Sequence, residues 1–188
     1  MTYGIIRRIV LLALSSAVAV LVVFLYAHNL GLRSPIAALS VVGAALGIVS
    51  VNLFTVRWSV PKALLPVRTW EASGRAYALL GVSIYGALLR RPPLRYFNTS
   101  VYVGERRANL PSTYANFLRA EGAHFWAFTF TTPLVFYELI HQWWDGFGWL
   151  LLFNAIFNVY PVLHLRQVRA RLEFLMQRCR LLEKPQQK

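Results

Sequence analysis

The chain contains few acidic residues and a single cysteine. Its 188 residues include 7 Asp and Glu against 20 Lys and Arg, for a formal net charge of +13 at pH 7. Cys179 on its own forms no intramolecular disulfide and no cysteine-based metal cluster. Because there is also no HExxH pattern, no histidine-rich box and no glycine-rich phosphate loop, we expect neither a metal nor a resident cofactor.

The shortage of acid does not indicate a soluble basic protein. Hydrophobic residues form 57% of the chain, and its mean hydropathy is +0.47. Nucleic-acid binding is one interpretation of a charge of +13, but no basic soluble domain remains once the apolar runs are removed. We therefore expect no nucleic-acid partner. The combination is typical of a membrane protein whose basic loops face the cytoplasm.

Four apolar runs are long enough to cross roughly 30 Å of hydrocarbon at about 1.5 Å per helical residue. They occupy residues 9–27, 36–56, 123–140 and 147–165. The first run resembles a signal peptide, but no small-residue cleavage pattern follows it, so we expect it to be retained. The sequence thus predicts an all-α integral membrane protein, a single domain over 1–188 with four transmembrane helices.

The positive charges predict the orientation of these helices. Ten Lys and Arg lie in residues 57–119, seven follow residue 165, and Arg7 and Arg8 precede the first run. Of the remaining loops, only the first contains a positive residue, Arg33. Since cytoplasmic loops carry the excess of Lys and Arg, we expect both termini inside, with a cytoplasmic segment 57–119 and a basic tail 166–188.

Residues 76–89 form a further apolar stretch, bounded by Arg75 and Arg90. The stretch is short for a crossing, and a fifth span would move the basic C-terminal tail outside. We therefore expect a helix that lies in the cytoplasmic interface or re-enters the membrane from that side. Its neighbouring arginines suit anionic lipid headgroups.

Gly43 and Gly47 lie on one face of the second apolar run. Small residues at this spacing let another membrane helix approach closely, which favours a contact with a partner membrane protein. Glycine is also frequent in membrane helices that make no such contact. Both interpretations stay open from the sequence.

A charged pair lies at the start of the third apolar run. Glu121 and His124 stand three residues apart and share one face of a helix. A carboxylate beside an imidazole can fix its tautomer and raise its basicity, as a general base requires. The alternative is an interfacial pair that only caps the helix or reaches the headgroups.

The fourth apolar run and its tail contain matching polar groups. Asn154 and Asn158 lie one turn apart and are followed by Pro161. The tail carries three arginines, Arg166, Arg169 and Arg171. Together with the histidine, these groups are suited to bind an anion and deprotonate a hydroxyl. Alternatively, the amides hold a helical hairpin together while the arginines bind lipid headgroups.

Three short stretches carry distinctive motifs: WEASGRAYALLGVSIY (70–85), RAEGAHFW (119–126) and NVYPVLHLRQVRARL (158–172). Their order resembles the glycosyl-4,4'-diaponeurosporenoate acyltransferase family of bacterial membrane proteins. The first is similar to a family stretch in which Glu and Gly precede an aromatic-rich segment. The second is similar to an Arg-Ala-Glu-x-x-His-Trp motif, and the third to an Asn-x-Pro stretch followed by spaced arginines.

The resemblance implies an enzyme of the bacterial inner (cytoplasmic) membrane that moves a fatty acyl chain onto a hydroxyl of a glycosylated carotenoid or similar glycolipid. In such a reaction His124, oriented by Glu121, would be the base, and Asn158 would donate to the oxyanion. Three arginines would hold the phosphates of an acyl-CoA co-substrate, namely Arg166, Arg169 and Arg171. A non-catalytic scaffold, a lipid-binding protein or a small subunit of a membrane complex is the alternative function.

Overall fold

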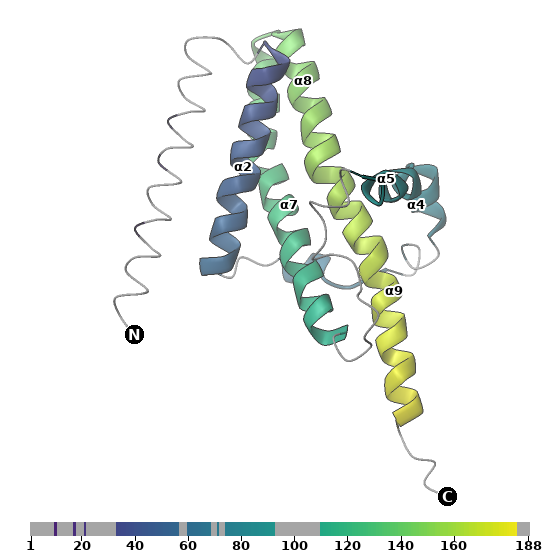
Figure 1. Cartoon of the computed structure of the whole chain (residues 1–188). Coiled ribbons are helices and arrows are strands. Elements are labelled where there is room, and N and C mark those ends of the chain that lie inside the picture. The colour runs from purple at the N-terminus through teal and green to yellow at the C-terminus, as the bar shows by residue number, and fades with distance from the viewer. Residues whose placement is uncertain are drawn as a thin grey trace, which may run out of the picture. The chain divides into compact units, whose positions relative to one another are not determined.

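The computed structural model describes residues 10, 17, 21, 33–56, 60–68, 71, 74–92 and 110–183. Every regular element in this part of the chain is helical, as the sequence predicts. The elements are α2 (Pro35–Val56), η1 (Lys62–Leu64), α4 (Arg75–Leu79), α5 (Val82–Leu89), α7 (Leu110–Ile140), α8 (Trp144–Asn154), η4 (Ala155–Val159) and α9 (Tyr160–Glu183) (Figure 1). Apart from isolated positions, the predicted first helix 9–27 lies outside the described residues.

The chain divides into two compact units. The first draws on Met1–Val60 and Gly122–Pro161, and the second on Pro61–Glu121 and Val162–Lys188. Two continuous stretches of helix pass from one unit into the other, namely α7 and the α8–η4–α9 helix. Each unit has its own buried contacts, which position a different group of polar residues.

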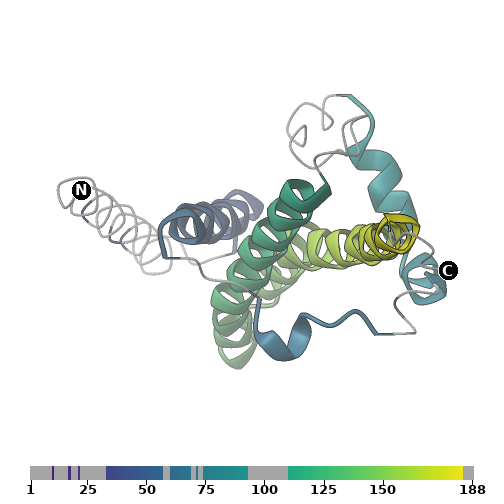
Figure 2. The ribbon, with the colours of Figure 1, turned by 90° about the horizontal axis from the view of Figure 1, so that it is seen from below.

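The first unit contains α2, α8 and the second half of α7, which lie side by side (Figures 1 and 2). α2 begins with favourable N-terminal signals, since the Ser34 Oγ accepts a hydrogen bond from the Ala37 N–H at 3.1 Å and Pro35 occupies the first helical position. The core between the three helices is made of small and branched side chains, Ala37, Ala38, Val41, Val42, Val135 and Leu150. Such side chains allow the helices to approach closely.

Gly43 and Gly47 lie on an exposed part of α2. A Cβ atom at either position would meet no atom within 4 Å in the part of the chain that the structure describes. The face on which the sequence places a partner helix is therefore uncovered among these residues. The partner itself stays a prediction.

The stretch 76–89 forms two short helices, α4 and α5, instead of one. Gly74 and Gly81 precede them with φ angles of 69° and 71°, a left-handed conformation that glycine adopts without steric cost. Neither helix is long enough to cross a membrane. Their outward side is apolar, since Leu79 is 90% and Ile84 is 76% exposed.

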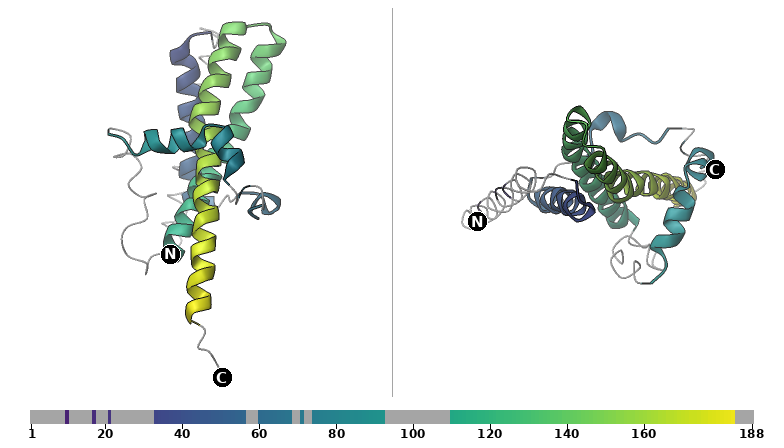
Figure 3. Two further views of the ribbon diagram at one scale, coloured as in Figure 1. Left: turned by 90° about the vertical axis from the view of Figure 1, so that its right-hand side faces the viewer. Right: turned by 90° about the horizontal axis from the view of Figure 1, so that it is seen from above.

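In the second unit, α5 crosses α9 where Gly86 meets His164 (Figure 3). A Cβ at residue 86 would lie 2.6 Å from the His164 Cε1, so a larger side chain does not fit unless the ring moves. The first half of α7 also packs on α9, through Phe117 against Leu165 and Leu172. These contacts bring α7, α9 and the segment 61–92 together around a set of charged groups.

One helix among the described residues is long and apolar enough to cross a membrane, by length and composition. It runs from Trp144 to Gln177 and contains the predicted span 147–165. The predicted span 36–56 corresponds to α2, and 123–140 lies in α7, which begins earlier, at Leu110. Residues 166–183, expected as a tail, continue α9. The four-span topology with both termini inside is therefore not confirmed and stays a prediction.

Candidate functional site

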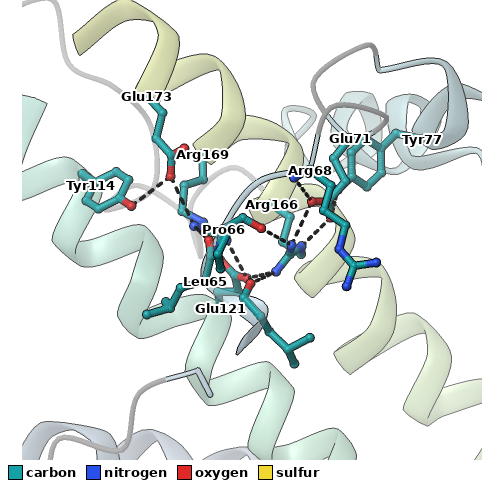
Figure 4. Close-up of polar contacts among 11 residues, drawn as sticks. Leu65, Pro66, Arg68, Glu71, Tyr77, Tyr114, Glu121, Arg166, Arg169 and Glu173 are labelled. Atoms are coloured by element: carbon teal, nitrogen blue, oxygen red, sulfur yellow. Dashed lines mark hydrogen bonds and ion pairs between the residues drawn. The ribbon is translucent and has the colours of Figure 1, made fainter. Parts of the chain in front are cut away.

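Three of the seven acidic residues meet two arginines in a buried network in the second unit (Figure 4). Its charged members are Glu71, Glu121, Arg166, Arg169 and Glu173. The arginines project from α9 at positions one turn apart, while Glu71 and Glu121 reach them from the segment before α4 and from α7. A large share of the few acidic residues in the chain therefore lies in this one network.

Arg166 binds two carboxylates at once. Its Nε donates to the Glu71 Oε1 at 2.8 Å and its Nη2 to the Glu71 Oε2 at 2.9 Å, which is a bidentate pair. Its Nη1 donates to the Glu121 Oε1 at 3.2 Å. The same guanidinium also donates to the carbonyls of Leu64 and Pro66. Arg166 therefore ties η1 and the segment that follows it to α9.

Arg169 is completely buried and is also fully engaged. Its Nε donates to the Glu121 Oε2 at 2.9 Å, and its Nη1 donates to the Glu173 Oε1 at 3.2 Å. A further hydrogen bond reaches the carbonyl of Leu65. Transfer of a guanidinium from water into the protein interior is costly unless its N–H groups are paired. These contacts supply that pairing.

Two tyrosines lie at the ends of the network. The Tyr77 hydroxyl donates to the Glu71 Oε1 at 3.0 Å, and the Tyr114 hydroxyl donates to the Glu173 Oε1 at 2.9 Å. Burial alone would raise the pKa of Glu71, but hydrogen bonds from Arg166 and from the Arg68 backbone N–H outweigh it and lower that pKa to about 2. Burial and the adjacent Glu71 charge raise the pKa of Tyr77 to about 12.

The charge balance of this network indicates what it can bind. With all groups ionised, three carboxylates outweigh two guanidiniums, so the network has no positive charge left for a phosphate. Arg166 and Arg169 are held by protein groups, whereas Arg171 is exposed on the next part of α9. Of the three predicted phosphate-binding arginines, Arg171 is the one whose side chain faces outward.

A second polar group lies in the first unit, at the π-helical turn η4. The His124 Nδ1 forms a hydrogen bond of 2.9 Å with the backbone carbonyl of Phe157. The Asn158 Nδ2 donates to the Asn154 Oδ1 at 2.8 Å, and both amides are buried. The Asn158 Oδ1 is buried and accepts no hydrogen bond within the described part of the chain. π-Helical turns are frequent at functional sites because they reorient side chains locally.

Glu121 and His124 both lie on α7, as their spacing predicts, but their contacts differ. The Glu121 carboxylate is bound by two arginines, and the His124 imidazole is bound by the Phe157 carbonyl. The contact that fixes the imidazole tautomer therefore comes from the backbone of η4. No group of three or more His, Cys, Asp or Glu among the described residues is placed to hold a metal ion.

Neither Glu71 nor the Phe157 carbonyl is among the site groups that the sequence predicts. Glu71 carried one available signal, since it is one of seven acids and stands in the first of the three motifs. The sequence also contains a signal for the Phe157 carbonyl, because Pro161, four residues later, has no N–H to donate to it.

A family model of glycosyl-4,4'-diaponeurosporenoate acyltransferases (CrtO) matches residues 61–178, well over half of the chain. The chain belongs to this family. No curated protein and no solved structure matches it. The acyltransferase family match contains both the carboxylate–arginine network and the His124 group, and it leaves out α2. Both polar groups therefore lie in the region by which a glycosyl-4,4'-diaponeurosporenoate acyltransferase is recognised.

Proposed function

We propose that the chain is a membrane acyltransferase that moves a fatty acyl group onto a hydroxyl of a glycosylated carotenoid or a similar glycolipid. Family membership supports the reaction class. The observation that carries the proposal is the hydrogen bond between the His124 Nδ1 and the Phe157 carbonyl. A carbonyl oxygen only accepts, so Nδ1 carries the proton and Nε2 carries the lone pair that a general base needs.

In the proposed step the His124 Nε2 takes the proton of the acceptor hydroxyl as its oxygen attacks the carbonyl carbon of an acyl thioester. The C–O bond forms, the C–S bond breaks, and the imidazolium returns the proton to the leaving thiolate. General-base action of this kind contributes roughly 100- to 10,000-fold in rate. The acyl donor is proposed to be acyl-CoA, with the exposed Arg171 facing the phosphates.

Asn158 is proposed to serve the same step. Its amide nitrogen carries two hydrogens, and Asn154 takes one of them, so the other is free to donate to the developing oxyanion. Its buried Oδ1, which lies near the His124 imidazole, suits a substrate hydroxyl as donor. In this proposal Arg166 and Arg169 brace the fold around Glu71 and Glu121 and do not touch substrate.

The membrane arrangement belongs to the same proposal. Four helices would cross the bacterial inner membrane with both termini in the cytoplasm, and α4 and α5 would lie in the interface. The exposed leucine and isoleucine side chains of α4 and α5, with Arg75, Arg90 and Arg91 at the ends of the segment, support that placement.

A non-catalytic membrane scaffold is the second candidate function. Two observations favour it: the most strongly charged group of residues is internally paired, and the Gly43–Gly47 face is uncovered among the described residues. In that case the His124 contact would be a helix-packing bond, and its removal would change no lipid product.

The first test compares the lipids and pigments of membranes that contain native protein, His124→Ala, or no protein. Mass spectrometry follows acylated glycolipids and glycosyl-carotenoids, at matched protein levels. His141→Ala is the matched control, since His141 is an exposed histidine in the turn after α7. The proposal expects the acylated species in the native and His141→Ala samples and its loss in His124→Ala. Equal profiles in all samples would support the scaffold.

A further inference from the structure

The α8–η4–α9 helix changes its hydrogen bonding next to the histidine-binding carbonyl. At η4 the Tyr160 N–H bonds to the Ala155 carbonyl, five residues back instead of four. Two positions further, the carbonyl of Phe157 would ordinarily accept from the N–H of residue 161. Residue 161 is proline and has no N–H. Because of this proline, the Phe157 carbonyl lacks its usual hydrogen-bond donor within the helix.

His124 supplies a donor in place of the missing one. Its Nδ1 lies 2.9 Å from the Phe157 carbonyl oxygen, and both residues belong to the first unit. Since the oxygen cannot donate, the neutral ring must keep its hydrogen on Nδ1 to make this bond. The other ring nitrogen, Nε2, then holds the lone pair. The absence of an N–H at Pro161 thus determines the tautomer of His124, which lies on a different helix.

Other histidines and prolines of the described chain show that this pairing is particular. The His164 Nδ1 is buried and has no hydrogen-bond partner among the described residues. Pro133, which lies inside α7, withholds a donor from the Thr129 carbonyl in the same way, but no histidine contact to that carbonyl occurs in the described structure. Of these two helix prolines, Pro161 is therefore the one that leaves a carbonyl, that of Phe157, to be bound by an imidazole.

We infer that Pro161 is a positioning residue, which keeps the Phe157 carbonyl available so that His124 is held as the Nδ1–H tautomer with Nε2 ready to accept a proton. The inference rests on the proposed function where it assigns that lone pair to the acceptor hydroxyl. The tautomer itself is a physical property that can be measured without any reaction.

The test uses the full chain in lipid nanodiscs with ¹⁵N-labelled histidine, at a pH above about 7.5, where an ordinary imidazole is neutral. NMR distinguishes a protonated ring nitrogen from an unprotonated one, and His124→Gln assigns the signals. We expect the native protein to show the proton on Nδ1. A native His124 with its proton on Nε2 would overturn the inference, with no variant needed.

Pro161→Ala restores an N–H that competes for the carbonyl, and Pro133→Ala is the matched control. We expect Pro161→Ala to move part of the His124 population to the Nε2–H tautomer, whereas Pro133→Ala leaves it unchanged. In the proposed reaction kcat should fall by about 10- to 100-fold with KM within about 2-fold, since only base catalysis is affected. An unchanged tautomer in Pro161→Ala would overturn the inference.

The two proposals fail in different ways. If the tautomer moves in Pro161→Ala but His124→Ala transfers acyl groups at the native rate, the tautomer inference stands and the catalytic role of His124 is wrong. If His124→Ala is inactive and Pro161→Ala keeps both the native tautomer and the native kcat, the catalytic role stands and the role of Pro161 is wrong.

Discussion

At the scale of single residues, Glu71 is the carboxylate whose ionisation depends most clearly on its contacts. Arg166 binds both of its oxygens, and the Arg68 backbone N–H donates to the Oε2 at 2.7 Å. These bonds favour the ionised form despite burial, which lowers the pKa from 4.5 to about 2. A shift of this size corresponds to about 3 kcal/mol of linkage between protonation and folding.

Acid should therefore destabilise the native protein through Glu71. Because the folded-state pKa is lowered, the contribution is complete above the unfolded value of 4.5 and is lost as the pH falls toward 2. Thermal unfolding of native protein and Glu71→Gln is compared between about pH 6 and about pH 3. The stability difference between them should shrink steadily over that range. A difference that does not change with pH would show that Glu71 titrates normally.

Arg169 and Arg171 offer a matched comparison on one helix. Arg169 is buried between Glu121 and Glu173, and Arg171 is exposed. Arg169→Met removes one of the two guanidiniums that bind Glu121 and the guanidinium that binds Glu173, and it should cost about 3–5 kcal/mol of unfolding free energy. Arg171→Met should change it by no more than about 0.5 kcal/mol. Denaturant unfolding measures both, and equal effects would contradict the network as a structural brace.

At the scale of helices, the crossing of α5 over α9 depends on a glycine. A Cβ at Gly86 would lie 2.6 Å from the His164 Cε1, and Tyr85 packs edge-on to the same ring with centroids 6.2 Å apart. The imidazole thus has a neighbour on more than one side. Only a residue without a side chain lets the two helices meet here.

Gly86→Ala should accordingly destabilise the protein by about 1–3 kcal/mol through overpacking. His164→Ala in the same chain should recover part of that loss, because it removes the ring that the new Cβ meets. Gly43→Ala is the control, since its Cβ would meet nothing within 4 Å among the described residues. Helical circular dichroism during heating compares the native protein, both single variants, the double variant and the control. Additive losses in the double variant would contradict this contact.

The helices themselves were largely predictable, whereas their ends and their partners were not. The apolar runs 36–56 and 123–140 coincide with α2 and the second half of α7. The start of α7 at Leu110 was missed because its first turns are polar and pack through Phe117. η4 was missed because a π-helical turn has no periodic signature of its own.

The same limit applies to the candidate site. Helical spacing correctly puts Glu121 and His124 one turn apart on α7. It does not show that the Glu121 oxygens accept charge-assisted hydrogen bonds from a guanidinium. Nor does it show that Glu71 meets Arg166, which is 95 positions away in the sequence. Such partners are set by tertiary packing.

At the scale of the whole molecule, the charged residues form two groups, one paired inside the protein and one composed of the remaining positive residues. Three acids neutralise two arginines inside the second unit, and most of the remaining positive charge lies in the segments that the sequence assigns to the cytoplasmic side. The family match spans both polar groups. We propose that the carboxylate–arginine network stabilises the fold and that His124 carries out the chemistry.

The most direct test of that division uses purified full-length protein in lipid nanodiscs. It is supplied with an isotope-labelled long-chain acyl-CoA and a glycolipid or glycosyl-carotenoid that has a free sugar hydroxyl. Mass spectrometry then locates the label. We expect transfer to the sugar by the native protein and at least a roughly 100-fold lower rate with His124→Ala at equal folding. Transfer at the native rate by His124→Ala, or no transfer by any form, would contradict this proposal.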